Sequence, residues 1–231
     1  MANGRGMIMR RIVRMLGLVT AIAILSGCAA VQRMAGISPA FEVWIPDQGY
    51  DKVHIYAVTE GDGEVKVAKS GEIALAPPGP QPTVAPHILL FGPGYKRAYV
   101  AGVRAGAMFV VDAEKRTVIA TVPTGRVAHA ATPSWDGSRI WVANLGDNNI
   151  VEVMAQGGSY TKGRTIATDP RPSCAFWSRD DNSFWVITGG PPKAPEDQAG
   201  TITEVDAKSG KVTKVIQPIG RDGCAVVPSY D

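Results

Sequence analysis

The chain has 231 residues, of which 24 are lysine or arginine and 21 are aspartate or glutamate, so its formal net charge is +3. Four of the arginines fall within residues 1–27, and without that segment the formal charge is 3 − 4 = −1. A nearly neutral remainder argues against nucleic acid, or another polyanion, as the partner. The 26 glycines and the charged fraction of 19% are typical of a turn-rich, all-β domain.

Residues 1–27 have the pattern of an export signal. An arginine-rich start is followed by the apolar run Met15–Leu25, which is too short for the roughly 20 residues that a membrane span needs. The run ends in Leu25-Ser26-Gly27-Cys28, which resembles the lipobox of bacterial lipoproteins. This resemblance implies cleavage before Cys28, lipid on its sulfur, and a periplasmic or cell-surface protein anchored to a bacterial membrane. An ordinary secretory signal with a chance cysteine is the alternative.

A repeat follows residues 28–41, which we interpret as a tether. Tyr99-Val-Ala, Trp141-Val-Ala and Trp185-Val-Ile stand 42 and 44 residues apart, separated by short alternating strands and turns. The Asp136-Gly137 pair predicts a two-residue hairpin turn with positive φ at both positions. A period of this length is typical of a four-stranded antiparallel unit that buries its apolar face against its neighbours. We therefore expect the three aromatic residues in the core between sheets.

The best-formed unit reads Val-Val-Asp112, then Thr117-Val-Ile-Ala-Thr-Val-Pro-Thr-Gly125, Pro133-Ser-Trp-Asp-Gly137 and Ile-Trp-Val-Ala-Asn144. These residues resemble the YVTN-type β-propeller repeat, and the resemblance extends from about Val43 to residue 231. It implies an all-β fold with blades of four antiparallel strands around a central channel. Known members include surface-layer proteins, lactonase-like enzymes and the haem-binding propeller of nitrite reductase. The resemblance therefore indicates the fold more than the function.

The repeat count predicts an incomplete β-propeller domain over residues 42–231, with about four to five blades. Pro228-Ser-Tyr-Asp231 matches Pro133-Ser-Trp-Asp136 and stops where the hairpin glycine should follow. We expect Trp44-Ile-Pro-Asp47 to be an isolated strand that closes a missing last blade. Such a chain would expose two sheet edges and apolar flanks.

The candidate site residues share one place in the repeat, where the pattern is Arg-x-x-[His/Cys]-Ala. The members are Arg126 with His129, Arg171 with Cys174, Arg221 with Cys224, and His87 without an arginine. In a propeller this is the loop into an inner strand, so we expect these side chains at the mouth of the central channel. Guanidinium groups there could bind a carboxylate or phosphate. Imidazole and thiolate could hold a borderline metal or an axial position on haem iron.

An architectural role is the alternative, in which each arginine bonds carbonyls or an acid of the adjoining blade. Cys174 and Cys224 could pair as a disulfide, act as ligands, or stay free. The sequence contains no Ser-His-Asp arrangement, HExxH, glycine-rich phosphate loop or paired CxxC. We therefore expect a lipid-anchored scaffold that binds an envelope protein or a small ligand. The alternatives are a cofactor- or metal-binding propeller and a lactonase-like hydrolase.

Overall fold

The computed structural model describes residues 41–61 and 63–226, and this part of the chain is all-β apart from two short 3₁₀ helices, Pro93–Tyr95 and Glu196–Gln198. The signal segment, Cys28 and the tether up to residue 40 lie outside the described residues. Phe41, predicted as the end of the tether, begins a strand. Within the described residues, no helix is long and apolar enough to cross a membrane.

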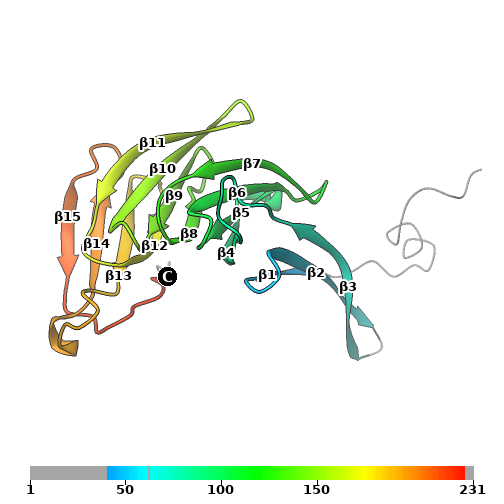
Figure 1. Ribbon diagram of the computed structural model, residues 1–231, viewed down its shortest axis with the longest axis horizontal. Coiled ribbons are helices and arrows are strands. Elements are labelled where there is room, and N and C mark those ends of the chain that lie inside the picture. Colours follow the sequence, from blue (N-terminus) through cyan, green and yellow to red (C-terminus); the bar gives the residue numbers. More distant parts are fainter. Residues whose placement is uncertain (1–40, 62, 227–231) are drawn as a thin grey trace, which may run out of the picture.

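Three of the sheets have four antiparallel strands each, arranged in chain order from the inner strand to the outer. Sheet 2 consists of β4 (Pro86–Phe91), β5 (Arg97–Gly102), β6 (Ala107–Asp112) and β7 (Thr117–Pro123). Sheet 3 consists of β8 (Ala128–Pro133), β9 (Arg139–Asn144), β10 (Asn149–Gln156) and β11 (Ser159–Ala167). Sheet 4 consists of β12 (Pro172–Trp177), β13 (Ser183–Thr188), β14 (Thr201–Asp206) and β15 (Val212–Ile216). The sheets follow one another along an arc (Figure 1), which confirms the predicted propeller architecture.

Sheet 1 has three strands, β1 (Phe41–Asp47), β2 (Lys52–Gly61) and β3 (Glu64–Ala74), with β2 in the middle. The prediction that residues 44–47 form an isolated strand is wrong, because Trp44 pairs with Ile55 of β2 in a regular antiparallel ladder. The strand takes the second position of a blade. Asp47 pairs with Lys52 across a loop of the same length as the one that follows Asn144. Among residues 41–61 and 63–226, sheet 1 thus has no inner strand like those of the other sheets.

The core lies between successive sheets rather than within one of them. Tyr99 and Trp141 are 3% and 0% exposed because the next sheet covers each ring. Trp185, in the same place of sheet 4, is only half-buried, since the described residues provide no further sheet to cover it. The prediction that these aromatic residues lie in the core between sheets is therefore confirmed for Tyr99 and Trp141 and is wrong for Trp185.

The hairpin between β8 and β9 forms as predicted, but its turn differs. Ser134 and Arg139 close a loop of four residues through a hydrogen bond of 2.8 Å from the Ser134 N–H. Gly137 alone has a positive φ (73°), whereas a type I′ turn needs two such residues. The Asp136 carboxylate accepts hydrogen bonds from Ser134 and Ser138 instead, which favours the longer loop.

Candidate ligand-binding site

Each loop that leads into an inner strand has one residue in the left-handed backbone region. These residues are Ala85 (φ 49°), Val127 (φ 56°), Arg171 (φ 63°) and Asp222 (φ 53°). In the first three loops, the carbonyl oxygen of this residue accepts a hydrogen bond from the backbone just after the blade's second strand. The four positions are therefore structurally equivalent, and Arg171 corresponds to Val127 rather than to Arg126.

The predicted Arg-x-x-[His/Cys] alignment is thus wrong by one residue in sheet 4. The strand pairs that open sheets 3 and 4 begin at Ala128 and Pro172, so Ser173 takes the place of His129 and Cys174 that of Ala130. The predicted alignment would require a positive φ at Pro172, which the proline ring forbids. The alignment is correct in the last loop, where Asp222 is left-handed and Cys224 takes the place of His129.

Two of the three arginines bond a neighbouring acid, as in the architectural alternative. Arg126 Nε lies 2.6 Å from Asp147 Oδ1, and its Nη2 donates to the carbonyl oxygen of Gly146 at 2.7 Å. Arg171 Nη2 lies 2.6 Å from Asp222 Oδ1. Within the described part of the chain, the Arg221 side chain makes no hydrogen bond or ion pair.

His87 and His129, on adjacent inner strands, form a hydrogen-bonded chain with a definite direction. His129 Nδ1 lies 2.8 Å from the carbonyl oxygen of Ser173, which can only accept, so Nδ1 carries the proton. With His129 neutral, its Nε2 accepts from His87 Nε2, 3.1 Å away. The remaining His87 Nδ1 accepts from Gln48 Nε2 at 2.5 Å. His129 is neutral in this arrangement.

Burial reinforces the neutral state of His129. Partial burial lowers the pKa of His129 below its ordinary value, the Ser173 hydrogen bond opposes this, and the charge that His87 can carry lowers it further. Both ring nitrogens of His129 are engaged in this arrangement, Nδ1 with Ser173 and Nε2 with His87.

The two cysteines lie side by side without a disulfide, so that alternative is not realised. Both thiols are free, and Cys174 Sγ donates to the carbonyl oxygen of Cys224 at 2.9 Å. Burial raises the pKa of Cys174 to about 12, whereas Cys224 is exposed. Among the described residues, no group of three or more His, Cys, Asp or Glu side chains is placed to hold a metal ion.

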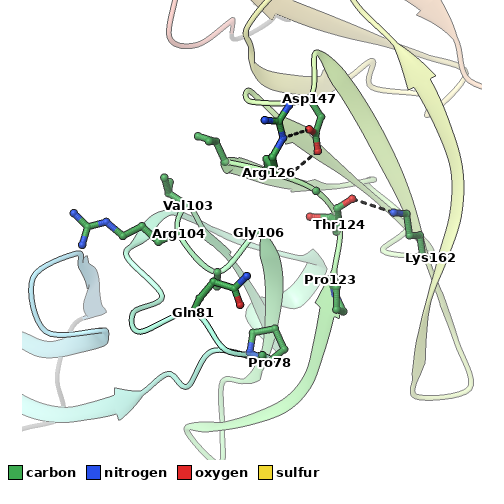
Figure 2. A pocket seen from close by; sticks show the side chains of 14 residues that line it. Pro78, Gln81, Val103, Arg104, Gly106, Pro123, Thr124, Arg126, Asp147 and Lys162 are labelled. Atoms are coloured by element: carbon green, nitrogen blue, oxygen red, sulfur yellow. Dashed lines mark hydrogen bonds and ion pairs between the residues drawn. The ribbon is translucent and has the colours of Figure 1, made fainter.

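A pocket of about 760 Å³ lies where the loops of sheets 2 and 3 meet. Its lining comes from the 78–81 loop, the turn 103–106, the loop 123–127, Asp147 and Lys162 (Figure 2). Lys162, on outer strand β11, reaches back to the carbonyl oxygen of Thr124 at 3.0 Å. Arg126 turns toward Asp147, and Arg104 lies on the opposite side of the pocket in this view.

The lining of this pocket is cationic. It carries the charges of Arg104, Arg126 and Lys162 against the single carboxylate of Asp147, which gives a net charge of 3 − 1 = +2. Hydrogen bonds from the Arg126 side chain and backbone hold the pKa of Asp147 below its ordinary value. Asp147 therefore offsets only one of the three cations at neutral pH. The chemistry of the lining suits a small anion such as a carboxylate or a phosphate.

Of the pocket's charged residues, only Arg126 was expected from the sequence. Arg104 and Asp147 follow the second strands of their blades, and Asp147 lies in a turn whose role a periodic pattern does not reveal. The polar run around Lys162 resembles an ordinary solvent-exposed outer strand. Gly106, Gly125 and Gly146 lie in three different tight turns and are the remaining local signal, since a Cβ on any of them would lie within 2.9 Å of a neighbouring atom.

Comparison with known proteins bears on the fold alone. No protein-family model matches the sequence, and no curated protein matches it. Among solved structures, the periplasmic gluconolactonase of Pseudomonas aeruginosa is 20% identical with a TM-score of 0.56, over 78% of this chain and 52% of that one. Virginiamycin B lyase from Staphylococcus aureus is 18% identical with a TM-score of 0.52, over 78% and 53%. Hydrazine synthase of Kuenenia stuttgartiensis is 17% identical with a TM-score of 0.53, over 60% and 37%. The chain thus spans about half the length, or less, of these structures.

Proposed function

We propose that this chain belongs to an extracytoplasmic β-propeller that binds a small anionic ligand in the pocket between sheets 2 and 3. The observation that carries the proposal is the lining charge of +2, contributed by Arg104, Arg126 and Lys162 against Asp147. Lys162 supports it most directly, because its ammonium group hydrogen-bonds a neutral backbone carbonyl and keeps its full charge beside the pocket.

The export signal and the lipobox-like residues ending at Cys28 give the proposed location. A lipid on Cys28 would hold the propeller at a bacterial membrane, on the periplasmic or cell-surface side. Small organic acids and phosphorylated compounds are the ligand class that the charge favours. The scaffold would bind its ligand without transforming it, as the missing catalytic motifs indicate.

Binding of D-gluconate to the full chain, measured by isothermal titration calorimetry, tests this proposal. We expect Lys162→Gln to weaken binding by roughly 10-fold or more, because a charge-assisted hydrogen bond is worth about 1.5–3 kcal/mol. Lys66→Gln is the matched control, since Lys66 stands on sheet 1 with a side chain that is 76% exposed. Equal affinities for gluconate and an uncharged polyol, or no difference between Lys162→Gln and Lys66→Gln, would rule out the anion site.

A lactonase-like hydrolase is the second candidate, favoured by the structural likeness to a periplasmic gluconolactonase. In such a reaction, water adds to the lactone carbonyl, the ring C–O bond breaks, and one carboxylic acid is formed. The proton of the attacking water ends on the ring oxygen, which becomes a hydroxyl group, and the cationic pocket would receive the carboxylate product.

Hydrolysis of glucono-δ-lactone, monitored with a pH indicator that reports the acid released, distinguishes the two candidates. A hydrolase would exceed the uncatalysed rate, and Lys162→Gln would reduce that excess because the product carboxylate binds the cationic pocket. A chain that binds gluconate but never exceeds the uncatalysed rate would leave the binding scaffold as the function and end the hydrolase hypothesis.

A further inference from the structure

The histidine pair of β4 and β8 holds two ring nitrogens at the spacing of neighbouring ligands on one metal ion. His87 Nε2 and His129 Nε2 are 3.1 Å apart. Two imidazole nitrogens that each bond one Zn²⁺ ion at about 2.0–2.1 Å, with an angle of about 90–110° between them, lie about 2.9–3.4 Å from each other. The ring centres are 4.5 Å apart and the ring planes cross at 67°, so the rings meet at an angle rather than end to end. The two Nε2 atoms therefore have the right separation to contact the same ion.

The outer nitrogen of each ring has a partner of its own. His129 Nδ1 lies 2.8 Å from the carbonyl oxygen of Ser173 on β12, and His87 Nδ1 lies 2.5 Å from the side-chain amide of Gln48, in the loop between β1 and β2. A histidine that ligates a metal almost always donates its other ring N–H to a carbonyl, a carboxylate or water, which fixes the tautomer and the orientation of the ring. The carbonyl group of Ser173 provides this partner for His129 as the structure stands.

His87 needs one rearrangement to become a ligand. When its Nε2 bonds an ion, the ring proton moves to Nδ1, which must then donate a hydrogen bond. Gln48 provides the acceptor, because turning its side-chain amide puts the carbonyl oxygen where the NH₂ group lies. Gln48 is exposed, so its amide has room to turn. Both Nδ1 atoms then donate outward and both Nε2 atoms present a lone pair.

An ion can reach this pair without passing through the cationic pocket. Strands β4, β8 and β12 lie along the inner side of the arc (Figure 1), and both histidines are half-buried rather than enclosed. Neither histidine lines the pocket between sheets 2 and 3. The pair is therefore a second site, separate from the proposed anion site.

We propose that His87 and His129 bind one divalent transition-metal ion, of the class of Zn²⁺, Ni²⁺ and Cu²⁺, through their Nε2 atoms. Imidazole suits these ions, whereas Ca²⁺ and Mg²⁺ need oxygen ligands. Among the described residues, no third His, Cys, Asp or Glu side chain joins the pair, so water completes the coordination. Binding replaces the hydrogen bond between the two Nε2 atoms and leaves the partners of both Nδ1 atoms in place.

Zn²⁺ binding, measured by isothermal titration calorimetry, tests the proposal. The full chain carries Cys28→Ala and Cys224→Ser, which remove competing thiols. We expect one Zn²⁺ ion per chain, and a loss of affinity of roughly 10–100-fold or more in His87→Gln and in His129→Gln. His54→Gln is the matched control, because His54 is the third histidine of the chain and its Nε2 contacts a carboxylate instead. With folding checked by circular dichroism, no binding without these substitutions, or an equal loss in His54→Gln, would overturn the proposal.

Imidazole ¹⁵N NMR of the same protein identifies the atoms that bind the ion. Zn²⁺ should shift the Nε2 signals of both rings, while Nδ1 of His129 keeps its proton and Nδ1 of His87 gains one. Zn²⁺ on either Nδ1 in place of Nε2 would overturn the proposal.

Gln48 allows a test that leaves both ligands in place. Gln48→Leu removes the acceptor for the His87 Nδ1 proton and should weaken Zn²⁺ binding by roughly 10–100-fold. Gln48→Glu should bind at least as tightly as the protein with Gln48, because an ionised carboxylate accepts hydrogen bonds without any need to turn. Equal affinities in Gln48→Leu and Gln48→Glu would show that His87 does not bind the ion through Nε2, and would likewise overturn the proposal.

Discussion

His87 and His129 bring their Nε2 atoms within 3.1 Å of each other although 42 residues separate them in the chain. The distance follows from the repeat, since the two histidines hold the same place on β4 and β8, which lie against each other. The carbonyl oxygen of Ser173 on β12 fixes the proton of His129 at Nδ1. This sets which nitrogen donates and which accepts in the hydrogen bond between the two histidines. Three successive blades are thus linked by one line of polar groups.

We expect His129 to titrate below the ordinary histidine value of 6.5. Burial is the largest cause of the lowered pKa, and it exceeds the opposing effect of the hydrogen bond to Ser173. Imidazole ¹⁵N NMR between about pH 5 and 8 measures the midpoint, and His129→Gln identifies its signals. A midpoint at or above 6.5, or a proton on Nε2 instead of Nδ1, would contradict the assigned arrangement.

The same group makes folding stability depend on pH. The folded pKa of His129 lies below the unfolded one, so the unfolded chain takes up a proton first as the pH falls. The stabilisation from the neutral ring is complete above the unfolded value and decreases as the pH falls below about 6.5. We expect the urea midpoint to fall more between about pH 7.5 and 5.5 in the wild type than in His129→Gln. Parallel decreases in the two proteins would show that His129 does not contribute.

The two cysteines should differ strongly in reactivity. Cys174 is 1% exposed with a pKa near 12, so almost no thiolate forms at pH 8, whereas Cys224 is exposed. In a Cys28→Ala background, iodoacetamide should modify Cys224 in the native protein and Cys174 only in denaturant. Peptide mass spectrometry locates the label, and Cys224→Ser is the control. Native labelling of Cys174 at the rate of Cys224 would mean that the loop after sheet 4 does not cover β12.

The sequence predicts the sheets correctly because the strand signals are local. Alternating apolar residues and turn residues recur with the period of one blade, and Tyr99 and Trp141 are buried at the expected places. The error in the alignment at Arg171 could also have been avoided from the local sequence, since Pro172 cannot take the left-handed conformation that Val127 takes. The pairing of β1 could also have been inferred, because Trp44 precedes its loop by the same number of residues as Trp141 does.

The anion pocket could not be predicted in the same way. Lys162 belongs to β11, whose pairing with β10 is shifted by an irregularity between Val151 and Val153. Its side chain meets Thr124 only because sheets 2 and 3 pack at a particular relative position. A contact of this kind depends on long-range geometry, which the residue pattern of one strand does not specify.

The turn glycines allow backbone strain to be separated from crowding. Gly106 and Gly157 have nearly equal φ values, 61° and 59°. A Cβ on Gly106 would lie 2.8 Å from the carbonyl oxygen of Gly125, whereas a Cβ on Gly157 would meet nothing within 4 Å. We expect Gly157→Ala to lower the free energy of unfolding by about 1 kcal/mol, and Gly106→Ala by about 1–2 kcal/mol more because its neighbour is backbone. Urea unfolding measures both, and equal losses would show that the loop 123–127 can move aside.

Trp141 and Trp177 form a matched pair that tests the cost of an unpaired indole. Both are buried and lie near an arginine, Arg164 over Trp141 and Arg139 over Trp177. Within the described residues, Trp141 Nε1 is buried without a hydrogen-bond partner.

Trp177 Nε1, by contrast, donates to the carbonyl oxygen of Thr132 at 3.2 Å. Replacing Trp141 with Phe removes packing but also removes an unpaired N–H, which costs about 1–3 kcal/mol to bury, so the two effects partly cancel. Trp177→Phe loses packing and a hydrogen bond together. We therefore expect Trp177→Phe to lower the free energy of unfolding by about 1 kcal/mol more than Trp141→Phe does in urea titrations. The opposite order would mean that the Trp141 N–H is satisfied in solution, for example by a buried water between sheets 3 and 4.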